Sequence, residues 1–225
     1  MVAAAKGYHI IIVMPETMSV ECRKLMKGYG AELILTPGSE GMKGSIAKAE
    51  ELVKEKSYYM PMQFDNPENP NIHELTTGPE IISAMNGIGK SVDAFVAGVG
   101  TGGTLSGIGR ALKKENPNTK VYALEPSESP LLKDGKTGKH GIAAGFIPKN
   151  LDKDVYDGIV EVSTDEAMKI ACEVAKNEGF LPGIFAGANI HGAIELAKKL
   201  GKGHAAVTVS PDGGDRYLST ALFNE

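Results

Sequence analysis

The chain has 225 residues, of which 42% are hydrophobic and 23% charged, and its formal net charge is −4. This composition is ordinary for a globular protein, and the weak negative charge gives no reason to expect nucleic acid or a membrane as a partner. The two cysteines, Cys22 and Cys172, form neither a metal-ligand spacing nor a disulfide framework, so we expect no metal site and a cytoplasmic location. No stretch approaches the roughly 20 apolar residues that span a bilayer.

The first 57 residues alternate between helical and extended patterns. The expected elements are the end of a helix at 1–6 stopped by Gly7, a strand at 9–14, a helix at 20–29 capped by Ser19, a strand at 31–36 and a helix at 41–55. This alternation predicts an α/β domain in residues 1–57.

The rest of the chain continues the alternation. Residues 58–63 predict a short strand, and residues 64–73 predict a loop because of their Asn and Pro content. The expected later elements are helices at 76–85, 104–114, 164–179 and 188–200 and strands at 94–99, 120–124, 156–162 and 205–209. Such an order predicts a parallel sheet whose ligands bind beyond the carboxyl ends of its strands. The irregular segment 127–148 is long enough to predict a functional loop.

One stretch, GVGTGGT at residues 98–104, joins an expected strand to an expected helix, and we call it the glycine-rich turn. Backbone N–H groups at such a helix start favour an anion, most simply a phosphate. The spelling also fits G-x-G-x-x-G with Glu125 after the next strand, which allows a dinucleotide site of an NAD-dependent dehydrogenase. The hydroxyls of Thr101 and Thr104 instead favour a single terminal phosphate. Glycines that serve only the turn geometry are a further alternative.

The glycine-rich turn and the residues after it resemble the phosphate-binding loop of the cysteine synthase (O-acetylserine sulfhydrylase) family, which uses pyridoxal phosphate. Further segments resemble that family in the same order: MPETMS (14–19), GAELILTPG (30–38), GMKGSIAKAEEL (41–52), QFDNPENPNIH (63–73), TTGPEI (76–81), EPSESPLL (125–132), AGFIPKNLD (144–152) and RYLST (216–220). The resemblance implies the α/β, tryptophan-synthase-β-like fold (fold type II), with parallel sheets flanked by helices. It places a remnant of the small N-terminal domain in residues 1–57 and the large domain in residues 58–225.

The resemblance also implies a site. Pyridoxal 5′-phosphate is expected to bind near these residues: Gly100, Thr101, Gly102, Gly103, Thr104 and Gly213. Gln63 and Gly141 match segments on the substrate side, where Gly141 belongs to a segment that closes over the site. The implied reaction replaces the acetate of an amino-acid substrate, O-acetylserine, by sulfide to give L-cysteine.

Three positions depart from the family pattern. Phe185 and Ala186 replace two serines of a Gly-Ile-Ser-Ser-Gly turn, and Gly213 replaces the Ser or Thr that hydrogen-bonds the pyridine nitrogen. A water is the expected substitute for the missing hydroxyl. These changes leave open an alternative, a degenerate non-catalytic paralogue that acts as a binding or partner protein.

The resemblance begins partway into the family sequence, so we expect an N-terminally truncated member. No lysine here lies in a context that resembles the family's Schiff-base lysine, and we therefore assign no catalytic residue and expect no normal turnover by this chain alone. The expected partners are a small-molecule substrate and either a second copy in a homodimer or a complementary N-terminal segment.

Overall fold

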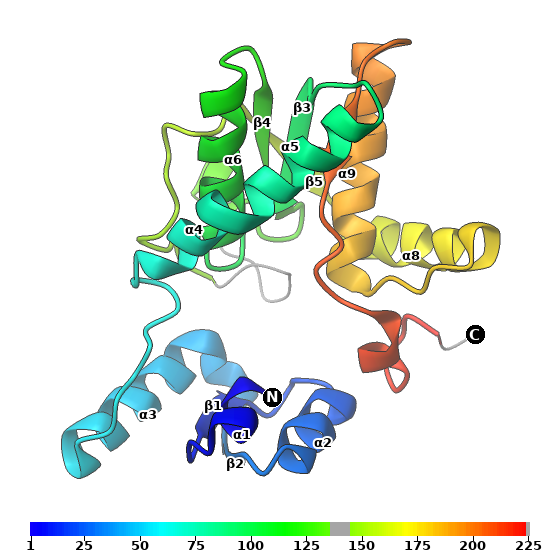
Figure 1. Ribbon diagram of the computed structural model, residues 1–225. Coiled ribbons are helices and arrows are strands. Elements are labelled where there is room, and N and C mark those ends of the chain that lie inside the picture. The colour runs from blue at the N-terminus through cyan, green and yellow to red at the C-terminus, as the bar shows by residue number, and fades with distance from the viewer. Residues whose placement is uncertain (136–144, 224–225) are drawn as a thin grey trace. The chain divides into compact units, whose positions relative to one another are not determined.

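The computed structural model describes residues 1–135 and 145–223 (Figure 1). Its contacts divide the chain into two compact units. Unit one consists of Met1–Pro61 with Gly214–Glu225, and unit two is Met62–Gly213. This division differs from the expected domains 1–57 and 58–225 at residues 58–61 and 214–225.

Unit one contains a two-stranded parallel sheet, in which Val13 lies opposite Ile34. Its elements are α1 (Val2–Lys6), β1 (Ile11–Pro15), α2 (Val20–Gly28), β2 (Glu32–Thr36), α3 (Gly41–Lys56) and two 3-10 turns, Gly38–Glu40 and Gly214–Tyr217. The expected helix cap is confirmed, because the Ser19 hydroxyl accepts the N–H of Cys22 at 3.3 Å. These elements lie close to their predicted bounds.

Unit two is built on a four-stranded parallel sheet in the order β5-β4-β3-β6, which confirms the predicted parallel arrangement. The strands are β3 (Ala94–Gly98), β4 (Lys120–Pro126), β5 (Gly158–Val162) and β6 (Ala206–Thr208). Val96 of β3 lies opposite Tyr122 of β4 on one side and Thr208 of β6 on the other. The segments that follow β3 and β6 therefore leave the sheet at the same edge.

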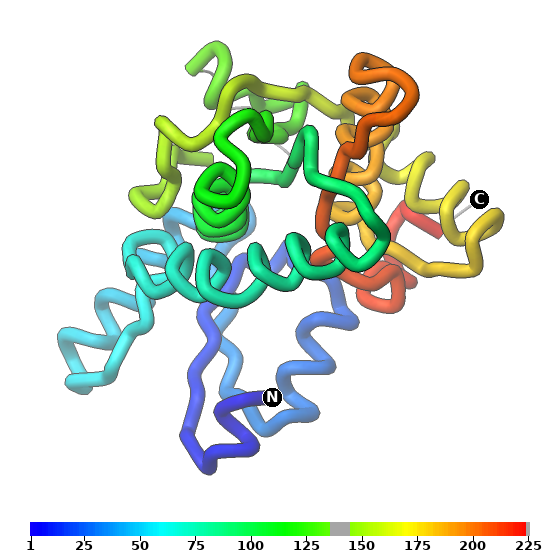
Figure 2. Tube along the Cα trace, turned by 45° about the horizontal axis from the view of Figure 1, so that its top comes forward, coloured from blue at the N-terminus to red at the C-terminus, as the bar shows by residue number. Residues whose placement is uncertain are grey.

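Helices cover both faces of this sheet. Figure 1 and Figure 2 show α5 (Gly78–Gly87) and α6 (Gly103–Glu115) on one face, with α8 (Thr164–Glu178) and α9 (Ile184–Leu200) on the other. Phe95 of β3 packs in the α6 layer with Leu105 and Ile108, whereas Val96 packs in the α9 layer with Leu196. Successive residues of a strand face opposite ways, so β3 is apolar throughout because both of its faces are buried.

Two predictions around residue 63 are wrong. Residues 58–63 form no strand: Pro61 lacks a backbone N–H for a sheet, and Met62 has a φ of 56°. The expected loop at 64–73 contains α4 (Glu68–Ile72), and a π-helical turn, His73–Thr77, joins α4 to α5. Pro70 is tolerated because it lies in the first turn, where a backbone N–H has no helical partner.

The start of α9 also differs from the prediction. The helix begins at Ile184 and not at residue 188, so the expected glycine turn at 183–187 is its first turn. The Asp212 carboxylate accepts the N–H groups of Phe185 (3.2 Å) and Ala186 (2.7 Å), which stabilises the helix start. The expected loop at 127–148 includes α7 (Leu131–Asp134), and residues 136–144 lie outside the described part.

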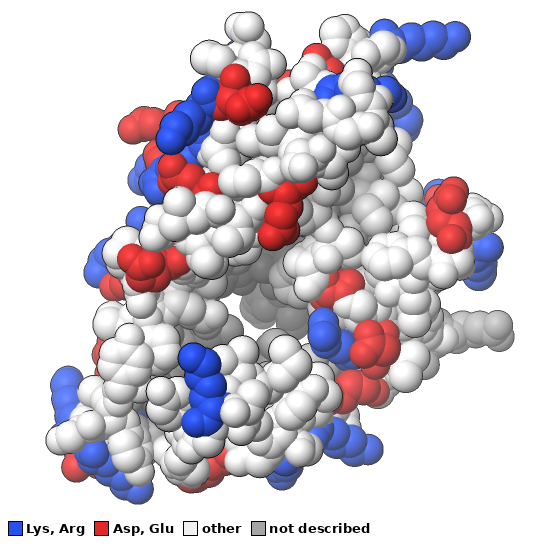
Figure 3. Space-filling view, in the orientation of Figure 1, with Lys and Arg blue, Asp and Glu red and all other residues white. Residues whose placement is uncertain are grey.

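The surface drawn in Figure 3 carries acidic and basic side chains interspersed among uncharged ones. Ion pairs on unit two include Lys113 with Asp157 at 2.9 Å and Arg110 with Asp152 at 2.8 Å. In residues 1–135 and 145–223, no helix has both the length and the apolar composition needed to cross a bilayer.

Candidate cofactor site

The glycine-rich turn leaves β3 and leads directly into α6. Gly102 has a φ of 83°, a left-handed conformation that disfavours side chains, and an ideal Cβ there lies 2.8 Å from the backbone N and Cα of Leu151. A Cβ at Gly103 overlaps the Oδ1 atom of Asn69. At Gly100, by contrast, an added Cβ meets nothing within 4 Å. The turn is thus closely supported at Gly102 and Gly103 and open at Gly100.

The turn offers hydrogen-bond donors that the described chain does not use. No acceptor in that part of the protein pairs with the backbone N–H groups of Thr101, Gly102, Thr104 or Leu105. Gly102 is buried and Thr101 half-buried, so an unpaired N–H there is costly unless a ligand accepts it. The N-terminus of the 13-residue helix α6 adds its positive dipole end. The arrangement fits a phosphate.

The hydroxyls of Thr101 and Thr104 are both contacted from the α4–α5 region. Asn69 Nδ2 donates to Thr101 Oγ1 at 3.0 Å. The Nε2 atom of His73 lies 3.4 Å from Thr104 Oγ1, and its Nδ1 atom lies 2.9 Å from the Thr77 hydroxyl. Burial lowers the pKa of His73, so its ring is neutral near pH 7. Both hydroxyls are therefore oriented by neutral partners.

Residues 150–152 support the other side of α6. The Ser106 hydroxyl donates to the carbonyl of Asn150 and accepts the N–H of Asp152, each at 2.9 Å. The Arg110 guanidinium, one turn further along α6, pairs with the Asp152 carboxylate at 2.8 Å. These contacts hold Leu151 against Gly102.

Asn189 of α9 ties the glycine-rich turn to the segment after β6. Its Oδ1 atom accepts the N–H of Gly98 at 2.8 Å, and its Nδ2 atom donates to the carbonyl of Val209 at 2.9 Å. The predicted Gly213 follows in this segment and pairs with Pro182 in an isolated bridge. Sequence reasoning missed Asn189, although an amide on an otherwise apolar helix face is a usable signal because it needs partners when buried; Asn189 is 3% exposed.

Gln63 lies next to the glycine-rich turn through its backbone. Its carbonyl accepts hydrogen bonds from Asn69 Nδ2 (2.7 Å) and Asn150 Nδ2 (2.8 Å), while the residue itself is exposed. The sequence also missed Asn69, which lies in a segment predicted to be a loop. The predicted Gly141 falls outside the described residues.

Glu125 does not serve a dinucleotide. Its carboxylate is buried, with the residue 3% exposed, and its two oxygens accept the N–H groups of Leu132 (2.6 Å) and Lys133 (2.9 Å). A ribose-binding acid needs an accessible carboxylate at the mouth of the site. The structure thus removes the support for the dinucleotide alternative.

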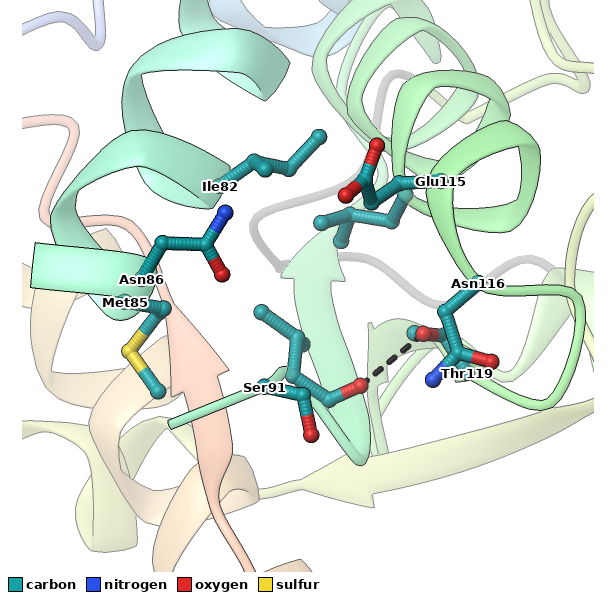
Figure 4. A pocket seen from close by; sticks show the side chains of 9 residues that line it. Ile82, Met85, Asn86, Ser91, Glu115, Asn116 and Thr119 are labelled. Carbon is teal, nitrogen blue, oxygen red and sulfur yellow. Dashed lines mark hydrogen bonds between the residues drawn. The ribbon is translucent and has the colours of Figure 1, made fainter. Parts of the chain in front are cut away.

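A pocket between α5 and α6 lies away from the glycine-rich turn (Figure 4). Ile82, Met85 and Glu115 line it, and a hydrogen bond of 2.9 Å from the Thr119 hydroxyl to the Val92 carbonyl crosses its wall. Val92 precedes β3 and Glu115 ends α6, so this pocket lies at the amino ends of the strands. It is separate from the candidate cofactor site.

A parallel sheet covered by helices, with unused hydrogen-bond donors at its carboxyl edge, defines an α/β protein whose site fits a phosphorylated ligand. The sequence profile of the family described as pyridoxal-phosphate dependent enzyme matches residues 1–212. A cysteine synthase from Staphylococcus aureus strain Mu50 is 57% identical over 226 residues, which cover 99% of this chain and 72% of that protein.

Solved structures of cysteine synthases and related enzymes also resemble this chain. A hydrogen sulfide-producing enzyme from Fusobacterium nucleatum has a TM-score of 0.93 at 42% identity, and the match covers 100% of this chain and 69% of the enzyme's chain. The O-acetyl serine sulfhydrylase isoform 3 of Entamoeba histolytica has a TM-score of 0.88 at 43% identity, and the match covers 98% of this chain and 67% of the sulfhydrylase chain. The chain therefore belongs to the pyridoxal-phosphate dependent enzymes and, within them, to the cysteine synthase family. The expected fold type II is confirmed.

Proposed function

We propose that this chain carries the phosphate-binding part of a pyridoxal-phosphate dependent cysteine synthase, which replaces the acetate of O-acetylserine by sulfide. The observation that carries the proposal is the set of unused backbone donors of Thr101, Gly102, Thr104 and Leu105, in a chain 57% identical to a cysteine synthase. Those donors lie at the carboxyl edge of a parallel sheet, where this fold binds ligands.

The residues present fit the cofactor's phosphate. Gly100, Thr101, Gly102 and Thr104 supply backbone N–H groups and two hydroxyls, Gly103 has no room for a side chain, and α6 supplies its positive dipole end. Pyridoxal phosphate, when bound, supplies the electron sink that this class of reaction requires. Gly213 is proposed to lie near the pyridine ring, where its lack of a side chain leaves the ring nitrogen to a water.

The other assigned residues are proposed to position the amino-acid substrate and the segment before Gly213. We propose that the exposed Gln63 and the Gly141 segment face the amino-acid substrate. The N–H groups of Phe185 and Ala186 are already bonded to Asp212, so the start of α9 supports the segment that precedes Gly213 and does not bind substrate.

We propose no catalytic residue in this chain. None of its lysines lies in a sequence context that resembles the family's Schiff-base lysine, and that lysine both anchors the cofactor and moves the proton in such enzymes. We therefore expect residues 1–225 alone to bind the cofactor without normal turnover. The proposed assembly, in a cytoplasmic setting, is a homodimer or a complex with a complementary segment, and only the complementary segment supplies the lysine.

The test uses the purified 225-residue chain. It is titrated with pyridoxal phosphate and followed by ³¹P NMR, and cysteine formation from O-acetylserine and sulfide is then assayed beside the Staphylococcus aureus enzyme. We expect saturable binding that Thr104→Val weakens and that Thr76→Val leaves unchanged, because the exposed Thr76 hydroxyl donates to the Ile72 carbonyl of its own helical turn.

Each result has a distinct meaning. Absence of any binding refutes the proposed cofactor site and favours the alternative, a non-catalytic binding protein. Cysteine formation at the rate of the Staphylococcus aureus enzyme refutes the proposed inactivity and leaves the family activity intact. Equal binding by the two threonine variants refutes the placement of the phosphate.

A further inference from the structure

Asn69, in the first turn of α4, determines which of the groups around it donate hydrogen bonds and which accept them. Its Nδ2 atom lies 2.7 Å from the Gln63 carbonyl oxygen and 3.0 Å from Thr101 Oγ1. A carbonyl oxygen only accepts hydrogen bonds, so the atom facing it must be the amide nitrogen, and the orientation of the Asn69 amide follows from chemistry. Its other atom, Oδ1, faces Gly103, where a Cβ has no room.

The orientation of the Asn69 amide fixes that of the Thr101 hydroxyl. Because Nδ2 can only donate hydrogen bonds, Thr101 Oγ1 must be the acceptor of this one. The Thr101 proton then points elsewhere, and no acceptor for it occurs in residues 1–135 and 145–223. Thr101 Oγ1 also accepts the N–H of Gly103 at 3.4 Å, so both of its lone pairs are used and the hydroxyl can only donate to a ligand. The phosphate of a monoester offers only acceptors once pH exceeds its second pKa of about 6.

We propose that Asn69 is a positioning residue that keeps the Thr101 hydroxyl a donor to the bound phosphate and couples the phosphate to the backbone of Gln63. The inference rests on the proposed function, because it concerns the phosphate of pyridoxal phosphate. One amide group makes both contacts, so a movement of either partner is transmitted to the other.

A second amide strengthens this coupling. Asn150 Nδ2 also donates to the Gln63 carbonyl, at 2.8 Å, and the Asn150 carbonyl accepts from Ser106 of α6. The Gln63 backbone is therefore held from both the α4 side and the α6 side of the glycine-rich turn. Binding at the turn and the placement of Gln63 share these hydrogen bonds.

The experiment compares Asn69→Asp with Asn71→Asp in the full 225-residue chain. An aspartate at position 69 cannot donate, faces the Gln63 carbonyl and accepts the Thr101 proton, so the hydroxyl no longer serves the phosphate. Asn71→Asp makes the same charge change two residues along α4, where the amide donates to the Glu68 carboxylate at 3.0 Å. Circular dichroism is used to check that both variants fold.

The measurement is the dissociation constant of pyridoxal phosphate, and of inorganic phosphate as the minimal probe, by ³¹P NMR. We expect Asn69→Asp to weaken both by about 10-fold to 100-fold, the range for one hydrogen bond to a charged group, and Asn71→Asp to change them by less than about 3-fold. Equal effects of the two variants overturn the inference.

A double-mutant cycle separates a positioning role from a structural one. If Asn69 acts through the Thr101 hydroxyl, Asn69→Ala weakens phosphate binding in the wild-type background and has little further effect in a Thr101→Val background. Additive losses overturn the inference. If the wild-type chain binds neither probe, it is the proposed function that fails, and the two failures are thereby distinguished.

Discussion

The close approach of Gly102 to Leu151 predicts that Gly102→Ala is strongly destabilising. Gly102 has a φ of 83°, and an added Cβ lies 2.8 Å from two backbone atoms of Leu151. Backbone atoms cannot rotate away as a side chain does. Leu151 is also held on both sides, because its neighbours Asn150 and Asp152 are hydrogen-bonded to Ser106.

Two costs combine in this variant. Holding an L-residue in the left-handed region costs about 1–2 kcal/mol. Forcing a methyl group into a closely packed contact costs about 1–3 kcal/mol. We therefore expect Gly102→Ala to lower the free energy of unfolding by about 2–5 kcal/mol, a large part of the total for a domain of ordinary stability.

Gly179→Ala is the matched control. Gly179 ends α8 in unit two with a φ of 65°, and an added Cβ there meets nothing within 4 Å. This control carries only the conformational cost, about 1–2 kcal/mol. Urea unfolding followed by circular dichroism measures both variants, since the chain contains no tryptophan. Equal losses of stability in the two variants refute the close contact between the glycine-rich turn and Leu151.

Three further predictions concern single side chains of unit two. The N–H of Ala205 and the ring of His204 lower the pKa of the Asp93 carboxyl, so its stabilisation is present above the ordinary pKa and lost as pH falls through the lowered one. Asp93→Asn is expected to flatten the acid limb of a urea-midpoint against pH curve, and an unchanged limb contradicts this. Asp212→Ala removes the cap of α9 and is expected to cost about 1 kcal/mol in urea unfolding, whereas Asp212→Asn retains most of it. Burial lowers the pKa of His73, so the wild type loses unfolding free energy as pH falls below about 6.5 and His73→Gln loses less; parallel pH curves refute this.

The strands of unit two could be predicted because their signal is local. β3 is an apolar run that both sheet faces bury, and its bounds differ from the prediction only at the last residue. The start of α9 could not be predicted, because the group that caps it, Asp212, lies far along the chain. Residues 68–73 belong to the segment predicted to be a loop because Asn and Pro favour turns on average, whereas here Asn66 accepts the N–H of Glu68 and starts a helix.

The site shows the same division between local and distant signals. The glycine spacing and two threonines identified an anion site, because these features occupy one short segment. The support of that segment comes from Asn69, Asn150 and Asn189, whose partners lie 6, 32, 87, 91 and 20 residues away in the sequence. The local pattern can indicate that a buried asparagine needs partners, but it does not show where in the sequence those partners lie.

The hydrogen bonds within the glycine-rich turn explain why a single phosphate fits it better than a dinucleotide. The N–H of Gly98 is bonded to Asn189, and the N–H of Val99 is bonded to the Leu124 carbonyl at 3.0 Å. The first glycine of the literal G-x-G-x-x-G pattern therefore has no donor left for a ligand. Unused donors begin further along, where the Thr101 hydroxyl joins them. A donor set confined to the start of α6 is compact enough for one phosphate group and too short to follow a pyrophosphate across the sheet edge.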